Sequence, residues 1–173
     1  MTAAGGSGLV LASQEPDVET RASSDHHEAL RLWLRMLATS NLVEARVRRL
    51  LQERFATTLP RFDLMSQLER VPEGLKMGEL SRRMMVTGGN VTGITDMLER
   101  ERLVARTPDP SDRRALRVRL TPAGRRAFRL MAEEHERWVV EAFSGLAPRE
   151  LTEFARLLGK LKNHIRSIEG TKP

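Results

Sequence analysis

Apolar residues follow two different patterns in the first third of the chain. Residues 1–25 contain Gly5-Gly6-Ser7-Gly8 and then an acidic, serine-rich run, and this composition buries too little apolar area to fold alone. From about residue 26 to residue 57, apolar side chains recur at helical spacing on more than one face. We therefore expect a disordered or loosely ordered arm over 1–25, followed by a long helix that is covered on both sides, as in a dimer core.

Three further helices are predicted before residue 103. Pro60 stands where it can open a helix, because its missing N–H costs least in the first turn. This helix has an inward stripe of Phe62, Met65, Leu68 and Val71. Pro72-Glu73-Gly74 then breaks the chain. A short helix over about 77–85 and another that ends near residue 102 follow.

From residue 103 the apolar period changes from 3.6 to 2. Residues 103–107 and 115–120 alternate as strands, and a turn-rich segment joins them into a hairpin. Thr121-Pro122 then starts a long helix with a threonine cap, and Pro148 starts a last one that continues to about residue 168. The predicted fold is mainly α, with four helices, a two-stranded hairpin and two more helices.

Positive charge is concentrated in the middle of this pattern. Residues 76–129 hold 13 Lys and Arg against 6 Asp and Glu, whereas the other residues hold 16 against 17. This basic block lies inside a folded region whose predicted helices and hairpin are of a size to enter the grooves of a duplex. Such a block indicates binding to phosphate backbones.

Composition excludes several other functions. The absence of Tyr and the low aromatic content, 4%, argue against binding of RNA or single strands by stacked rings. With no Cys and no metal-ligand spacing among the four His residues, we expect no metal, no cofactor, no catalytic residue and no enzyme activity. No apolar run reaches the roughly 18 residues of a membrane span, and no signal peptide is evident, so we expect no membrane partner and a cytoplasmic location.

The helix over about 87–102 has the properties of a DNA-reading helix. Val91, Ile94 and Leu98 fall on one side of it, and an opposite face carries Gly89, Thr92, Gly93, Asp96 and Arg100. Thr87 is placed to cap this helix, and its positive end would then seat a phosphate. Asp96 does not suit a phosphate-facing surface, so it is expected beyond the groove or paired with a neighbouring Arg.

Gly88 and Gly89 are poor helix residues, each costing about 1 kcal/mol relative to Ala. Close approach of the backbone to a duplex would explain them, with Asn90 reading adenine and Thr92 touching a thymine methyl group. The alternative is that these glycines end the preceding helix and form the turn.

Arginines at the hairpin tip are the second sign of DNA binding. Arg113, at the end of a two-stranded ribbon, can enter a narrow minor groove, and Asp112 can hold its guanidinium until DNA is met. The alternative is a solvated polar turn, which is common at loop tips.

Several runs resemble MarR-type winged helix-turn-helix regulators. They are Met77-Gly78-Glu79-Leu80-Ser81-Arg82-Arg83, the stretch Gly89–Glu99, Leu103-Val104, Asp109-Pro110-Ser111-Asp112-Arg113-Arg114 and Leu120-Thr121-Pro122-Ala123-Gly124. The resemblance implies a homodimer that binds a pseudo-palindromic double-stranded operator and usually represses. It places the DNA-binding domain at 59–120 and the dimerisation region at 26–58 and 121–168. The implied DNA contacts are Thr87, Gly88, Gly89, Asn90, Thr92, Gly93, Arg113, Arg114, Ser81 and Arg82.

Such regulators commonly release DNA when a small molecule binds, and parts of this chain are similar to regulators of aromatic-acid degradation. The resemblance suggests an effector cleft for an aromatic acid or an aromatic acyl-CoA, with polar groups from Arg35 and Asn41 and an apolar wall from Phe62 and Met65. The alternative is a hydrogen-bonded core Asn and a surface Arg. A ligand-independent architectural DNA binder would use the same helix and wing, but the cleft residues would then have no use.

Overall fold

The computed structural model describes residues 27–112 and 115–170, and it has the predicted order of helices. Its elements are α1 (Glu28–Phe55), α2 (Leu59–Glu69), β1 (Leu75–Lys76), α3 (Met77–Met84), α4 (Gly88–Arg100), β2 (Val104–Pro108), β3 (Leu116–Leu120), α5 (Pro122–Phe143) and α6 (Pro148–Glu169). Two compact units divide the chain, residues 1–42 and residues 43–173, and α1 runs through the boundary between them. The predicted arm over 1–25 lies outside the described residues.

The sheet has three antiparallel strands in the order β1-β3-β2, so it contains the predicted hairpin of β2 and β3 and one further strand, β1, that was not predicted. Leu75 pairs with Val118, and Val104 pairs with Leu120. With only two residues, β1 is too short to display an alternating pattern in the sequence. Gly74 leads into β1 with φ +91°, and a Cβ there would lie 2.6 Å from the carbonyl oxygen of Val118.

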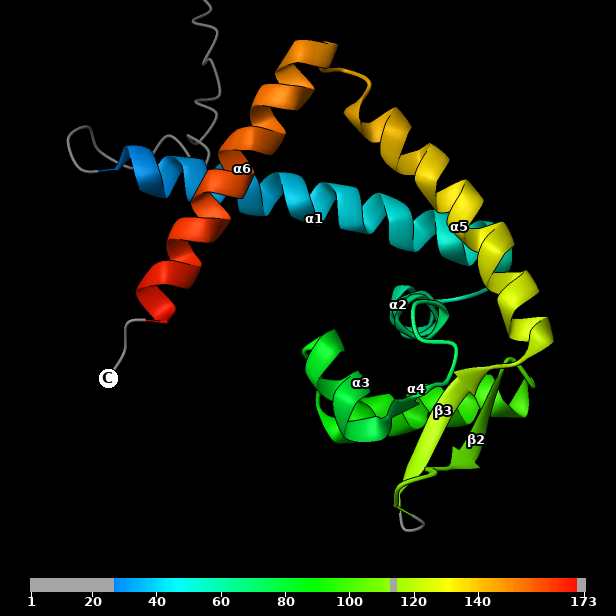
Figure 1. Cartoon of the computed structure of the whole chain (residues 1–173). Coiled ribbons are helices and arrows are strands. Elements are labelled where there is room, and N and C mark those ends of the chain that lie inside the picture. Colours follow the sequence, from blue (N-terminus) through cyan, green and yellow to red (C-terminus); the bar gives the residue numbers. More distant parts are fainter. Residues whose placement is uncertain (1–26, 113–114, 171–173) are drawn as a thin grey trace, which may run out of the picture. The chain divides into compact units, whose positions relative to one another are not determined.

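The core forms around α2, which lies between α5 and the pair α3 and α4 (Figure 1). Leu64 and Leu68 of α2 are fully buried, and Phe62 stacks on Phe128 of α5 with 5.4 Å between ring centroids. The buried apolar residues are Val47, Leu51, Phe62, Leu64, Met65, Leu68, Leu75, Leu80, Val91, Leu98, Val104, Val118, Leu120, Phe128, Met131 and Trp138. This core joins the C-terminal half of α1 to the helices and strands that follow it.

The junction between the sheet and α5 is fixed by Thr121. Its side chain accepts a hydrogen bond from the Gly124 N–H at 3.0 Å, which confirms the predicted cap. The same hydroxyl donates to the carbonyl of Arg102 at 2.7 Å. The start of α5 is therefore tied to the chain segment just before β2.

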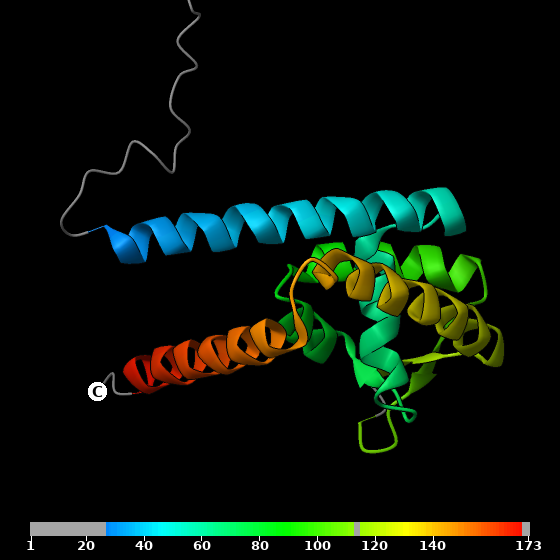
Figure 2. The same ribbon diagram turned by 90° about the horizontal axis from the view of Figure 1, so that it is seen from above.

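The last two helices meet at the turn over 144–147 and diverge from it (Figure 2). No residue of α6 is buried. Its partly exposed apolar side chains are Phe154, Leu157, Leu158, Leu161, Ile165 and Ile168. Within residues 43–170, α6 thus presents an apolar row that the single chain leaves open to solvent.

Candidate nucleic-acid interface

Helix α4 has one buried and one open face. Val91, Thr95 and Leu98 are 0% exposed, whereas Thr92 and Gly93 lie on the exposed side. Sequence reasoning placed Ile94 inward and overlooked Thr95, whose hydroxyl donates to the Val91 carbonyl at 2.7 Å and is thereby satisfied inside the core. Ile94 is only half-buried.

The N-terminus of α4 is open. Thr87 is the N-cap residue, as predicted, but its side chain makes no capping hydrogen bond. The first N–H groups of the helix are therefore left without a side-chain acceptor from Thr87, and they carry the positive end of the helix dipole. This arrangement suits an incoming phosphate oxygen.

Three glycines lie on the exposed part of α4. A Cβ built on Gly88, Gly89 or Gly93 would meet nothing within 4 Å. Packing inside the chain therefore gives no reason for any of them. All three are helical residues of α4, so the alternative that Gly88 and Gly89 only form the preceding turn is wrong.

The turn between α3 and α4 is held by Ser81. Its hydroxyl donates to the carbonyl of Val86 at 2.6 Å, and the Val86 N–H donates to the Ser81 carbonyl at 3.2 Å. The Ser81 hydroxyl hydrogen is thus already used within the fold, which leaves only its oxygen lone pairs for the DNA contact that the resemblance implies. Arg82, by contrast, is exposed at the end of α3.

The predicted readers on α4 are exposed. Asn90 lies at its third helical position, open to solvent. The Thr92 hydroxyl donates to the Gly88 carbonyl at 3.0 Å, one turn back on the same helix. With that hydrogen used, Thr92 can still offer a partner its methyl group and the lone pairs of its hydroxyl oxygen, and the methyl group fits its expected contact with thymine.

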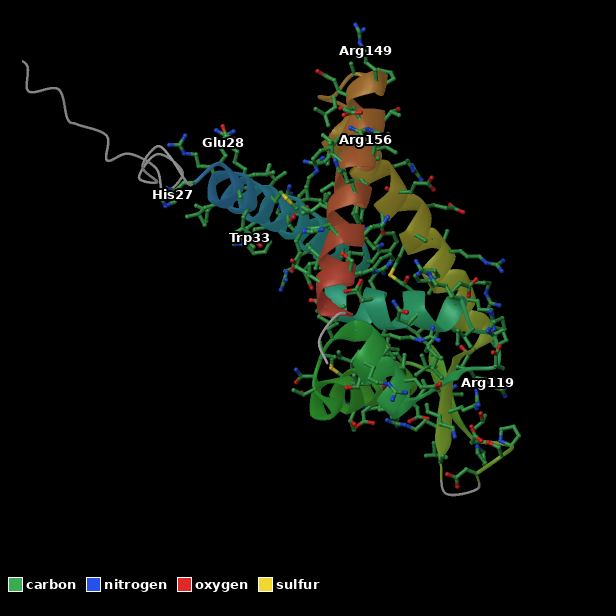
Figure 3. The ribbon with its side chains drawn as sticks, turned by 60° about the vertical axis from the view of Figure 1, so that its left-hand side comes forward. His27, Glu28, Trp33, Arg119, Arg149 and Arg156 are labelled. Atoms are coloured by element: carbon green, nitrogen blue, oxygen red, sulfur yellow. The ribbon has the colours of Figure 1, made fainter. Side chains whose placement is uncertain are left out.

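Part of the basic block is neutralised within the fold. Arg106 on β2 pairs with both Asp96 and Glu99 of α4, which confirms that Asp96 pairs with a neighbouring Arg. Among the described residues of this block, 76–112 and 115–129, the exposed arginines whose side chains have no hydrogen-bond or ion-pair partner are Arg82, Arg83, Arg102, Arg119 and Arg126. Arg119 lies on β3 (Figure 3). These side chains, rather than the block as a whole, can reach phosphates.

A buried carboxylate organises the base of the hairpin loop. Asp109 is 1% exposed and accepts hydrogen bonds from the N–H groups of Ser111 at 2.9 Å and Asp112 at 3.1 Å. It also pairs with Arg117 of β3, and Lys76 Nζ lies 3.5 Å from it. The hydrogen bonds from Ser111 and Arg117 outweigh the opposing effect of burial and hold the pKa of Asp109 well below its ordinary value.

We call the contacts of Asp109 with Ser111, Asp112 and Arg117 the Asp109 brace. The sequence did not predict it, because Asp109 stands in a polar turn where a solvated side chain is the ordinary expectation. Arg113 and Arg114, the predicted wing contacts, lie outside the described residues. Asp109 and Arg117 fix the two strand ends from which that tip extends.

The proposed effector residues lie in different environments. Arg35 and Asn41 are both exposed on α1, so the alternative that Asn41 is a core residue is wrong for the single chain. Phe62 is 6% exposed and Met65 is 1% exposed, and both pack in the core. Phe62 also faces His135 of α5, with 4.9 Å between ring centroids. As packed, Met65 has almost no surface to offer a ligand.

Residues 27–112 and 115–170 show neither a metal-binding cluster nor a helix that could span a membrane. No group of three or more His, Asp or Glu side chains there is placed to hold a metal ion. No helix in the same ranges is both long and apolar enough to cross a membrane.

Comparison with known proteins identifies the class to which this surface belongs. A profile of the MarR family matches residues 57–116. The chain is 25% identical to the transcriptional activatory protein BadR of Rhodopseudomonas palustris, over 92% of this chain and 93% of that protein. The structure of a MarR family transcriptional regulator from Silicibacter pomeroyi is 30% identical with a TM-score of 0.70, covering 83% of this chain and 99% of that one.

A third similar protein was solved with DNA. It is Sco3205, a MarR family transcriptional regulator from Streptomyces coelicolor, 26% identical with a TM-score of 0.71. The match covers 88% of this chain and 92% of that one. All of these relatives are regulators of transcription rather than enzymes, in agreement with what the residues indicated.

Proposed function

Because the chain belongs to the MarR family, whose members regulate transcription by binding DNA, we propose that it is a homodimeric repressor of a pseudo-palindromic operator. A small aromatic acid, or its acyl-CoA ester, releases it from that operator. The observation that carries the DNA-binding part is the open face of α4, where three glycines have empty space beside them and the helix N-terminus is uncapped by Thr87.

In this proposal α4 enters the major groove. Gly88, Gly89 and Gly93 allow its backbone to approach the duplex, while Asn90 and Thr92 contact base edges. The N–H groups after Thr87 bind a phosphate. Arg113 and Arg114 of the wing contact the adjacent minor groove, and Arg82 contacts the phosphate backbone.

The homodimer is supported by the apolar row of α6. Six large apolar side chains on one helix without a buried residue need a partner surface, and a second copy of the chain supplies the same row. We assign residues 26–58 and 121–168 to dimerisation and residues 59–120 to DNA binding. Two copies then present paired recognition helices to successive turns of one duplex.

Repression follows if the bound dimer covers a promoter, because the polymerase and the dimer then compete for the same DNA. The name of the Rhodopseudomonas palustris relative describes an activatory protein. Transcription in vitro is therefore needed to decide between repression and activation. Addition of the regulator to a template with its operator should lower the transcript yield, and an effective aromatic acid should restore it. A yield that rises with the regulator would contradict repression while leaving DNA binding intact.

Replacement of Arg113 by alanine tests the wing. We expect Arg113→Ala to weaken operator binding at least about tenfold, equivalent to about 1.4 kcal/mol, because a guanidinium is lost from the minor groove. Fluorescence anisotropy at fixed salt, with DNA selected by the purified protein, measures the change. Arg149→Ala, which removes the same charge at the start of α6, is the control. Equal affinity of the Arg113 variant and the parent would rule out the wing contact.

Gly93→Ala separates stability from DNA binding. Alanine is the better helix residue by about 1 kcal/mol, and nothing lies within 4 Å of the new Cβ, so the variant should melt at a higher temperature. Its operator affinity should nevertheless fall about tenfold, because the Cβ holds the helix away from the bases. Gly78→Ala on α3, also helical and open and not among the proposed DNA contacts, should be at least as stable as the parent without loss of affinity. If the Gly93→Ala protein binds the operator as tightly as the parent, Gly93 does not lie at the interface with DNA.

A further inference from the structure

Met85, which follows the last residue of α3, is the most exposed large apolar residue in the described ranges. Its exposed fraction is 92%. The residues on either side of it, Met84 and Val86, are partly buried and pack against the core. The Met85 side chain therefore gains almost no free energy from burial within the single chain.

The backbone of Met85 also disfavours a side chain. Its φ is 54° and its ψ is 38°, in the left-handed region where a Cβ crowds the following carbonyl oxygen. Glycine is the usual residue in this conformation after a helix, because it has no Cβ. Hydrogen bonds fix the turn on both sides of Met85. Its N–H donates to the Arg82 carbonyl at 3.3 Å, and the Val86 N–H donates to the Ser81 carbonyl at 3.2 Å. The fold of the single chain thus gives no reason for a methionine here.

The groups around Met85 are those that we assign to DNA. Thr87, the N-cap residue of α4, follows two residues later, and α4 begins at Gly88. Arg82 and Arg83 precede Met85 in the last turn of α3, and both are exposed. Along the chain, an exposed apolar side chain therefore stands between two exposed arginines and the start of the proposed recognition helix.

The chemistry of the major groove limits what such a side chain can contact. The base edges there present hydrogen-bond donors and acceptors, and thymine adds its C5-methyl group. Methionine carries no charge and no strong donor, so it distinguishes bases mainly through that methyl group. Its side chain is unbranched and its thioether is polarisable, which lets it adapt to the surface that it meets.

We propose that Met85 is a specificity-determining residue that contacts the methyl group of one thymine in each half-site. This inference rests on the proposed binding of α4 in the major groove. Contact with DNA buries the side chain that the single chain leaves exposed, and this burial offsets the unfavourable backbone conformation of Met85.

Replacement of thymine by uracil, one position at a time, tests the contact in DNA selected by the purified full chain. Uracil lacks only the C5-methyl group. At one thymine of each half-site, we expect uracil to weaken binding of the parent about fourfold, the value of one buried methylene group. Met85→Gly should bind the thymine operator at least about fourfold more weakly than the parent and should not respond to uracil at that position.

Two further variants assign this effect to the Met85 side chain. Met85→Leu keeps an apolar side chain and should keep the response to uracil. Thr92→Ser is the matched control, because it removes the other proposed contact with a thymine methyl group. It should lose the response to uracil at a different thymine and keep it at the thymine assigned to Met85.

The glycine variant also separates base recognition from stability. Because glycine suits the left-handed conformation, Met85→Gly should melt at the parent temperature or above it. Asparagine also tolerates this conformation but is polar, so Met85→Asn should bind the operator as weakly as Met85→Gly.

Oxidation of the unaltered chain tests the same contact without any substitution. Hydrogen peroxide transfers one oxygen atom to the methionine sulfur, which gives the sulfoxide and water. Mass spectrometry of the digested protein measures the rate at each methionine. We expect the operator to protect Met85 from oxidation and to leave the rate at Met36 of α1 unchanged.

Three results would each overturn the proposal. They are equal oxidation of Met85 with and without the operator, parental affinity of Met85→Gly, and equal responses of Met85→Gly and the parent to uracil at every thymine. A parent chain that binds no duplex would instead overturn the proposed function. If Asn90→Ala weakens operator binding and Met85→Gly does not, the proposed function stands and only the role of Met85 is lost.

Discussion

We expect Asp109→Ala to weaken operator binding at least about tenfold, although Asp109 makes none of the proposed DNA contacts. Its carboxylate accepts hydrogen bonds from Ser111 and Asp112 and pairs with Arg117 across the hairpin. Without it, the N–H groups at the start of the loop lose their acceptor and Arg117 loses its buried partner. The strand ends that position the wing tip then move apart.

The sign of this effect makes the experiment decisive. Removal of a negative charge near DNA should, by electrostatics alone, strengthen binding. A loss of affinity therefore reports on the geometry of the wing and not on charge. Glu153→Gln, which removes a carboxylate from the surface of α6, serves as the control and should leave affinity unchanged. If Asp109→Ala binds the operator as tightly as the parent, the wing does not depend on this brace.

The same carboxylate predicts a pH dependence. Because hydrogen bonds from Ser111 and Arg117 depress the pKa of Asp109 in the folded chain, the charged form is favoured by folding. Its contribution to stability is complete above the ordinary pKa of 3.8 and is lost as the pH falls through the lower, folded value. Asp109→Asn should therefore show a flatter decline of melting temperature than the parent as acid is added below pH 3.8.

The helical elements and the face of α4 were predictable because local patterns determine them. The 3.6-residue period, Pro60, the Thr121 cap and the change of period at residue 103 each act within one turn or one strand. The open glycines of α4 were also readable, since glycine in a helix interior is unfavourable without another reason.

Contacts between distant residues were not predictable in this way. Strand β1 exists only because Leu75 and Lys76 meet Val118 and Arg117 some 40 residues later, as the register records. The Asp109 brace likewise depends on Lys76 and Arg117 arriving from other strands. A polar turn in the sequence gives no sign of which of its carboxylates will be buried.

Thr95 shows a limit of a different kind. A helical wheel ranks side chains by polarity, and threonine therefore falls outside an apolar stripe. In the fold its hydroxyl is satisfied by the Val91 carbonyl of its own helix, so it packs as a small apolar residue. The helical wheel located the apolar side of α4 correctly. It does not indicate that the Thr95 hydroxyl is satisfied within its own helix and needs no other partner.

Replacement of Gly124 by alanine should destabilise the fold by about 3 kcal/mol or more. A Cβ at this position would lie 1.9 Å from the carbonyl oxygen of Leu103 and 2.9 Å from its carbon, far inside contact distance. That carbonyl cannot withdraw freely, because it accepts the Thr121 N–H at 3.0 Å and lies 3.2 Å from the Thr121 hydroxyl. Relief of the clash therefore breaks the junction between the sheet and α5. Thermal unfolding should show a fall of roughly 10 °C.

Gly78→Ala is the matched control for this change. Gly78 is helical in α3, and a Cβ there meets nothing within 4 Å, so the variant should be as stable as the parent or slightly more so. The contrast isolates the clash, since both variants lose the same backbone freedom in the unfolded chain. If the Gly124→Ala protein melts at the same temperature as Gly78→Ala, α5 can shift along the sheet without a cost in stability. The Thr121 junction would then not determine the direction in which α5 leaves the DNA-binding domain.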